Sequence, residues 1–129
     1  MEDNYNFKGK RILVVDDEEL NWLLIKDIFD DTNAVLTWAR VGQEAIDLVA
    51  SGELYDIILM DMKMPFLDGF DTTRAIKKLN SSIPVIAQTA FAMPEEQKKC
   101  VEAGCDNYLS KPIEMSVLLD MVDKYLNRN

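Results

Sequence analysis

Polar side chains able to do chemistry follow four short apolar runs in this sequence, and each run predicts a strand. They are Asp16, Asp17 and Glu18 after the first run, Asp61 after the third, Thr89 after the fourth and Lys111 after the fifth. Carboxylates this close together repel one another and need a cation. An oxygen-only ligand set without histidine favours a hard ion such as Mg²⁺, which completes its shell with water and phosphate.

Asp61 is the candidate nucleophile of this set. An aspartate can attack phosphorus and form an aspartyl phosphate. Mg²⁺, Lys111 and Thr89 could then offset the charge of the phosphoryl oxygens. Each residue alone has an ordinary explanation: Asp16 and Asp17 as a helix cap, Asp61 as a turn residue and Lys111 as a solvated one. Because all of them follow predicted strands, together they predict a phosphoryl-transfer site with Asp61, Lys111 and Thr89 as catalytic residues.

Strands and helices are predicted to alternate along the chain. Apolar runs predict strands at Ile12–Val15, Val35–Ala39, Ile57–Met60, Pro84–Ala87 and Asn107–Leu109. Amphipathic segments predict helices at Glu18–Asp30, Gly42–Ser51, Asp68–Leu79, Pro94–Ala103 and Glu114–Leu126. This alternation predicts an α/β fold, a five-stranded parallel sheet with helices on both faces, over residues 10–127. Residues 1–9 are predicted to be an N-terminal tail or linker. The carboxyl ends of parallel strands share one edge, so the polar set should meet there.

Composition excludes several classes of function. The chain has 129 residues, a net charge of −9 and no histidine. The negative charge argues against direct nucleic-acid contact, and the absence of histidine excludes Ser-His-Asp and Cys-His catalysis. No apolar run approaches the roughly 20 residues that span a bilayer, so no membrane contact is predicted. The acidic start differs from a signal peptide, which favours a cytoplasmic location. Cys100 and Cys105 are interpreted as packing residues.

Four motif pieces occur in a fixed order. They are Ile12–Asp17, Leu59–Pro65 with Asp68-Gly69, Ala87–Ala90, and Tyr108–Pro112. In this order and spacing the sequence resembles the receiver domains of two-component response regulators and hybrid histidine kinases, from about Lys10 to Leu126. The resemblance implies the (βα)5 flavodoxin-like receiver fold with strand order 2-1-3-4-5.

The resemblance also implies a role for each matching position. Asp61 would accept a phosphoryl group from the phosphohistidine of a partner, and Lys111 would pair with Asp61 or the phosphate. Thr89 and Tyr108 would be the switch residues, and Lys111-Pro112 would be a cis bond. The implied Mg²⁺ ligands are Asp17, Asp61, the main-chain carbonyl of Lys63 and, through water, Asp16, with Glu18 a lesser candidate.

Two further positions are interpreted as tuning the lifetime of the phosphorylated state. Lys63 lies two residues after Asp61, and Phe91 lies two residues after Thr89. In the family these positions flank the path of the attacking water. A bulky Phe91 would limit that water and slow the loss of phosphate.

Two helices are predicted to carry partner surfaces. The first would dock a histidine kinase dimerisation domain or a histidine phosphotransfer protein through Trp22, Ile25 and Phe29, with Leu20, Leu24 and Ile28 facing the core. The last helix could form a homodimer, but packing in the core is the favoured interpretation of its apolar residues. Its surface set is Val117, Met121 and Tyr125, and its core set is Met115, Leu118, Leu119, Val122 and Leu126.

The favoured function is a phosphoacceptor domain of a phosphorelay that signals by changing conformation. Such a domain catalyses its own phosphorylation and slow dephosphorylation, but it is no stand-alone metabolic enzyme. The run Met60–Pro65 and Asn21 favour the receiver of a hybrid sensor histidine kinase. A free-standing single-domain response regulator is the alternative.

Three other classes fit the residues less well. A haloacid-dehalogenase-like phosphatase with an aspartate nucleophile needs an aspartate two residues after Asp61, where Lys63 stands. A flavodoxin-like cofactor binder needs a phosphate loop rich in Ser, Thr and Gly, where this chain has three acidic residues. A degenerate receiver that only binds proteins is disfavoured, because every expected acidic, hydroxyl and lysine position is filled.

Overall fold

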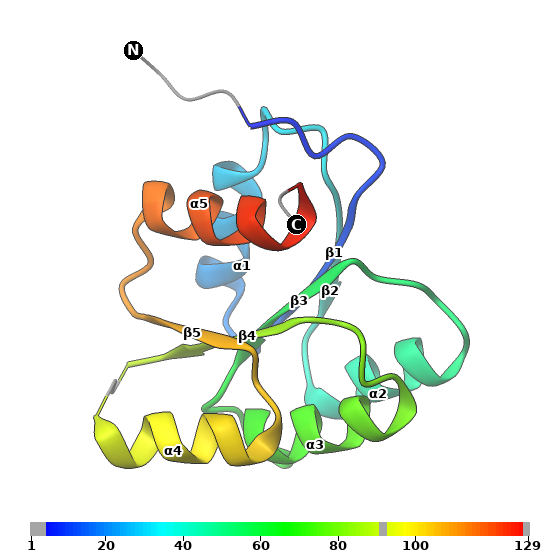
Figure 1. Ribbon diagram of the computed structural model, residues 1–129, viewed down its shortest axis with the longest axis vertical. Helices are drawn as coiled ribbons and strands as arrows, with labels where there is room; N and C mark the ends of the chain where they lie inside the picture. The colour runs from blue at the N-terminus through cyan, green and yellow to red at the C-terminus, as the bar shows by residue number, and fades with distance from the viewer. Residues whose placement is uncertain (1–4, 91–92, 128–129) are drawn as a thin grey trace.

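The α/β alternation is confirmed in the computed structural model, which describes residues 5–90 and 93–127 (Figure 1). Each crossover between successive strands contains one helix. The elements in chain order are β1 Arg11–Val15, α1 Glu19–Ile28, β2 Val35–Ala39, α2 Gly42–Ala50, β3 Ile57–Asp61, α3 Gly69–Leu79, β4 Val85–Thr89, α4 Pro94–Ala103, β5 Asn107–Ser110 and α5 Met115–Leu126.

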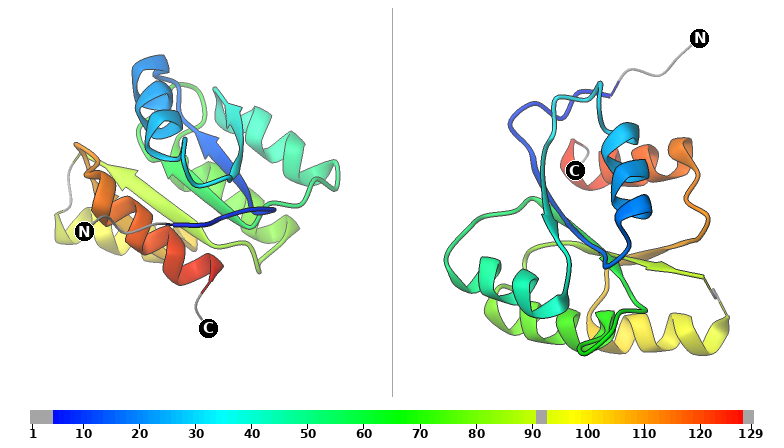
Figure 2. Two further views of the ribbon diagram at one scale, coloured as in Figure 1. Left: turned by 90° about the horizontal axis from the view of Figure 1, so that it is seen from above. Right: turned by 180° about the vertical axis from the view of Figure 1, so that it is seen from behind.

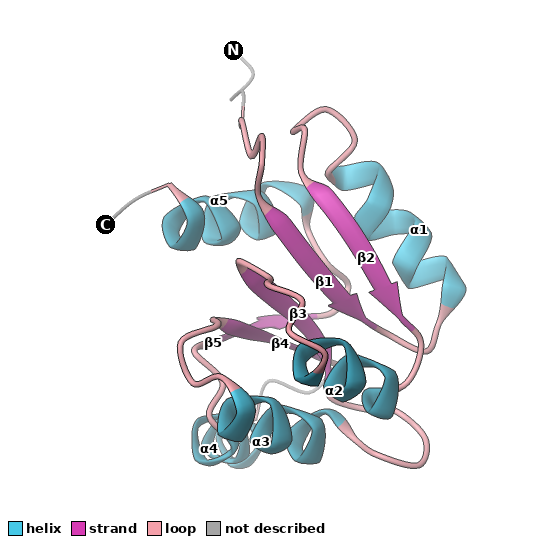
Figure 3. Cartoon of the chain, turned by 90° about the vertical axis from the view of Figure 1, so that its right-hand side faces the viewer, coloured by secondary structure: helices cyan, strands magenta, loops and turns pink. Residues whose placement is uncertain are grey.

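The sheet has the predicted order β2-β1-β3-β4-β5, and all its strand pairs are parallel. Helices α1 and α5 cover one face, and α2, α3 and α4 cover the other (Figures 1 and 2). The apolar residues of β1, β3 and β4 are buried on both sides, as continuous apolar runs require. Seen along the sheet in Figure 3, the strands twist steadily from β2 to β5.

Three strands extend further toward their carboxyl ends than the apolar runs indicate. β3 includes Asp61, β4 includes Thr89 and β5 includes Ser110. Their backbones stay in register, with Asp61 opposite Gln88 and Thr89 opposite Ser110. The candidate site residues Asp61 and Thr89 are therefore held by the sheet itself.

The N-terminal segment differs from the predicted tail, because Phe7 is fully buried. Its ring lies 6.0 Å from that of Tyr5 and 6.1 Å from that of Phe29. The Phe7 amide donates to the carbonyl of Thr32 at 2.7 Å, and the Tyr5 hydroxyl donates to Asp120 of α5 at 2.8 Å. Residues 5–9 therefore belong to the folded unit.

Helix α1 divides its apolar residues between core and surface differently from the prediction, although Ile28 is buried as predicted. Ile25 and Phe29 are buried, so their prediction as docking residues is wrong. Leu20 is 83% exposed and Leu24 is 43% exposed, so their prediction as core residues is also wrong. The sheet lies on the side of the helix that carries Ile25 and Ile28, and sequence periodicity alone did not identify which apolar stripe faces it.

The last helix follows its prediction in part. Leu118, Leu119 and Val122 are buried as expected, whereas Met115, the first residue of the helix, is 55% exposed, so its prediction as a core residue is wrong. Val117 is exposed, and Met121 is half-buried against the core.

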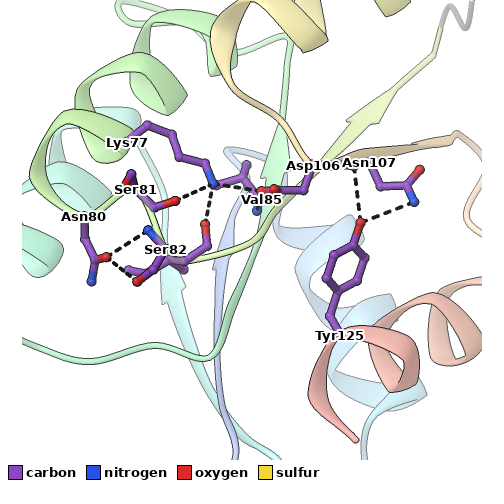
Figure 4. A network of polar contacts seen from close by, with 9 residues as sticks. Lys77, Asn80, Ser81, Ser82, Val85, Asp106, Asn107 and Tyr125 are labelled. Atoms are coloured by element: carbon purple, nitrogen blue, oxygen red, sulfur yellow. Dashed lines mark hydrogen bonds and ion pairs between the residues drawn. The ribbon is translucent and has the colours of Figure 1, made fainter. Parts of the chain in front are cut away.

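A polar network ties the amino ends of β4 and β5 to helices α3 and α5 (Figure 4). Lys77 of α3 pairs with Asp106 at 2.8 Å and donates to the Ile83 carbonyl at 2.7 Å. Asp106 also accepts the amide of Val85 at 2.8 Å, and its carbonyl accepts the hydroxyl of Tyr125 at 3.2 Å. The end of the sheet opposite the candidate site is thus braced by side chains.

None of the described helices is long and apolar enough to cross a membrane.

Candidate active site

Three carboxylates meet at the carboxyl edge of the sheet, as predicted. Asp16 and Asp17 follow β1, and Asp61 ends the neighbouring strand β3. One oxygen from each lies within 4.8 Å of the others. This oxygen-only donor set fits a hard divalent cation that keeps several of its own waters.

Asp61 lies at the bottom of this cluster and is 2% exposed. The ammonium group of Lys111 lies 3.1 Å from its Oδ1, and the amide of Lys63 donates to the same oxygen at 3.3 Å. Burial and the charge of Asp16 raise the pKa of Asp61 to about 6, and Lys111 lowers it. The effects of burial and of Asp16 on the pKa of Asp61 outweigh the effect of Lys111. The negative charge of the cluster is therefore only partly balanced, and a bound cation would stabilise it.

Asp16 is fully buried and is held by three donors, whereas Asp17 is exposed. The Glu18 amide donates to Oδ1 of Asp16 at 2.9 Å, the Asn21 amide group donates to Oδ2, and the Trp38 indole donates to the Asp16 carbonyl at 2.8 Å. Sequence reasoning gave Asn21 and Trp38 no role in this site. Trp38 reaches Asp16 only because β1 and β2 pair in the sheet, so no local sequence pattern indicates this contact.

Thr89 and Lys111 lie on the same edge as the carboxylates. Thr89 is 6% exposed at the end of β4. Its carbonyl accepts the main-chain amide of Lys111 at 2.8 Å, which ties the end of β4 to the segment after β5. The bond between Lys111 and Pro112 is cis, as the resemblance implied.

The other predicted residues lie around this edge or outside the described residues. Tyr108 is half-buried and packs against the core beneath α2, α3 and α4. Lys63 is exposed, with its main chain beside Asp61. Phe91 lies outside the described residues, so its predicted effect on dephosphorylation stays a prediction.

Gly69 allows α3 to begin directly beside Asp61. A Cβ at this position would lie 2.3 Å from the Asp61 carbonyl oxygen and 2.5 Å from the Met62 Cα. The preceding residue, Asp68, caps the helix by accepting the amide of Asp71 at 2.9 Å. The Asp68-Gly69 pair therefore fixes both the start of α3 and its close approach to β3.

A sequence model of the response regulator receiver domain matches residues 12–123. The chain belongs to this family. The receiver domain is 36% identical over 123 residues to the sensor protein GacS of Pseudomonas syringae, covering 92% of this chain and 14% of that protein. It is also 36% identical over 119 residues to the polar-differentiation response regulator DivK of Brucella anthropi, covering 91% of this chain and 96% of that one. The chain thus spans a small part of the kinases it matches.

Solved receiver structures share the fold. The receiver domain of the sensor histidine kinase PA1611 from Pseudomonas aeruginosa, which has a magnesium ion in its active-site cleft, superposes with a TM-score of 0.84. It is 31% identical, and the match covers 92% of this chain and 98% of that one. The Francisella response regulator 1452 receiver domain gives a TM-score of 0.85 at 32% identity, covering 93% of this chain and 98% of that one.

Proposed function

We propose that this receiver domain accepts a phosphoryl group on Asp61 from a partner phosphohistidine and then changes conformation to signal. The observation that carries the proposal is the buried Asp61 carboxylate, held between Lys111 and the acidic pair Asp16-Asp17. An Oδ atom of Asp61 attacks phosphorus, the phosphorus–nitrogen bond of the phosphohistidine breaks, and its electron pair stays on the imidazole nitrogen.

Residues at the edge of the sheet would assist this transfer. Asp16, Asp17, Asp61 and the Lys63 carbonyl would hold Mg²⁺, which supplies positive charge to the phosphoryl oxygens. Lys111 donates to Asp61 and would supply a second positive charge to the phosphoryl group. The Thr89 hydroxyl would donate to the new phosphoryl group, and Tyr108 would change its packing in response. Such a shift would change the populations of two pre-existing conformations.

The partner would be a histidine kinase dimerisation domain or a histidine phosphotransfer protein. Helix α1 starts at the site and exposes a row of apolar side chains outward. The proposed docking residues are Leu20, Leu23 and Leu24, which are exposed, with the half-buried Trp22. An amphipathic helix of the partner could cover this row and bring its histidine to Asp61.

Both parent architectures remain proposals. The relatives include a sensor kinase and a single-domain regulator at the same identity of 36%. The homodimer through Val117, Met121 and Tyr125 also stays a prediction.

Acetyl phosphate and Mg²⁺ provide a direct test without the partner. The native chain should gain one phosphoryl group in intact mass, and Asp61→Asn should gain none. EDTA should abolish the gain, and Thr73→Val, a change in a buried residue of α3 outside the site, should preserve it. Phosphorylation of Asp61→Asn would show that another residue is the acceptor. A folded native chain that gains no phosphate from acetyl phosphate or from a phosphorylated histidine domain would contradict the proposal.

A further inference from the structure

Asn21 links the acidic cluster to strand β4. Its side-chain amide donates to Oδ2 of Asp16 and lies 3.4 Å from Oε1 of Gln88. Gln88 lies in β4 between Ala87 and Thr89, is fully buried, and pairs in register with Asp61. A continuous polar chain therefore runs from a proposed metal ligand through α1 to the strand that carries the switch threonine.

The carboxylate fixes the direction of every hydrogen bond in this chain. An ionised Asp16 only accepts hydrogen bonds, so Asn21 must present its NH₂ group to it. That group also faces Gln88, which must therefore present its carbonyl oxygen. The Nε2 of Gln88 consequently points elsewhere, and no atom of the described residues accepts a hydrogen bond from it.

A buried amide with this arrangement does not stabilise the fold. A buried donor without a protein acceptor gives up its hydrogen bond to water without replacing it, which destabilises the folded state, and the bond to Asn21 is long. An apolar side chain of similar size would fill the same space without that cost. The contribution of Gln88 therefore has to be sought in the site, where it holds Asn21 against Asp16.

We propose that Asn21 and Gln88 are positioning residues that fix the Asp16 carboxylate for Mg²⁺ binding, with Gln88 acting through Asn21. The inference rests on the proposed function, because it concerns the metal site of that function. Removing a residue that hydrogen-bonds to a metal ligand commonly weakens metal binding 10-fold to 100-fold, because that residue sets the orientation of the ligand. The polar contacts from Asp16 through Asn21 to Gln88 also connect β4 to the proposed metal site.

Calorimetric Mg²⁺ titration of four variants tests this arrangement. The variants are Asn21→Leu, Gln88→Met, the double variant and the control Thr73→Val. We expect Asn21→Leu to weaken binding about 10-fold and Gln88→Met about threefold or more. The double variant should bind no more weakly than Asn21→Leu, because two residues acting in series are not additive. Thr73→Val should bind like the native chain.

Thermal unfolding without Mg²⁺ separates positioning from general damage. The midpoint of Gln88→Met should equal or exceed that of the native chain, although its Mg²⁺ affinity falls. Unchanged or tighter Mg²⁺ binding by Gln88→Met would overturn the inference, as would losses that add in the double variant or a Gln88→Met protein that is both less stable and weaker in binding. A native chain that binds no Mg²⁺ would instead refute the proposed function itself.

Discussion

The buried charge of Asp61 costs the fold free energy when no cation is present. Its pKa lies at about 6 instead of 3.8, chiefly because of burial and then because of Asp16. A raised pKa means that the folded state binds the proton more tightly than the unfolded state does. The destabilisation is therefore absent below pH 3.8, grows as pH rises, and is complete above about pH 6.

Asp61→Asn is accordingly expected to stabilise the metal-free chain. At about pH 7.5 its free energy of unfolding should rise by about 1–2 kcal/mol, below the roughly 3 kcal/mol that the full pKa shift represents, because Lys111 loses its partner. At about pH 4 the difference should be largely lost. Urea denaturation at both values measures this. An equal gain at both would show that removal of the charge is not its cause.

Phe66 lies in the left-handed region with φ of 68° and is fully exposed. A bulky side chain is strained there, and this one gains no packing in return. Phe66→Asn should raise the free energy of unfolding by about 0.5–1 kcal/mol, measured by urea denaturation. Phe66→Ala should gain less, since alanine tolerates this backbone less well than asparagine does. A loss of stability in Phe66→Asn would contradict the strain argument.

At the scale of the element, α1 shows how one helix divides its apolar residues between core and solvent. Ile25→Ala should lower the free energy of unfolding by about 2–4 kcal/mol, because Ile25 is fully buried. Leu20→Ala should change it by less than about 0.5 kcal/mol, since Leu20 is 83% exposed. Chemical denaturation compares the two. Similar losses in both variants would contradict the orientation of the helix.

The junction of β3 with α3 depends on Gly69. Gly69→Ala should destabilise the chain by more than about 2 kcal/mol, because its Cβ would strike the backbone of Asp61 and Met62. The matched control is Gly52→Ala, which has φ of +94° but open space around it and should cost about 1 kcal/mol. Denaturation midpoints decide between them. A smaller loss at Gly69 than at Gly52 would mean that the junction adapts.

At the scale of the whole molecule, the N-terminal segment joins α1 and α5 through its aromatic side chains. Phe7→Ala should reduce the free energy of unfolding by about 3–4 kcal/mol, because Phe7 is fully buried between these helices. Tyr5→Phe removes only a hydrogen bond to Asp120 and should cost about 1 kcal/mol or less. Calorimetric unfolding of both tests whether residues 5–9 are part of the cooperative unit. A loss below about 1 kcal/mol in Phe7→Ala would show that they are not.

The sequence by itself determined the order of the helices and strands, the parallel sheet and the polar residues at its carboxyl edge. Apolar periodicity and the residues that begin and end helices are local signals. Pro94 begins α4 and Gly104, with φ of +103°, ends it at the predicted positions. Parallel strands then bring the carboxylates together, because their carboxyl ends share one edge. The resemblance added the strand order, which the structure confirms, and the proposed role of each residue at this edge.

Tertiary structure alone decided which side of α1 is buried and which distant groups meet. The apolar residues of α1 fit either assignment of core and surface until the sheet selects one. Phe7 is recognised as core only when α1 and α5 close around it. Trp38 contacts Asp16, and Gln88 contacts Asn21, across the boundaries of strands and helices, where no sequence spacing indicates the contact. Such contacts depend on packing between elements, which local periodicity does not encode.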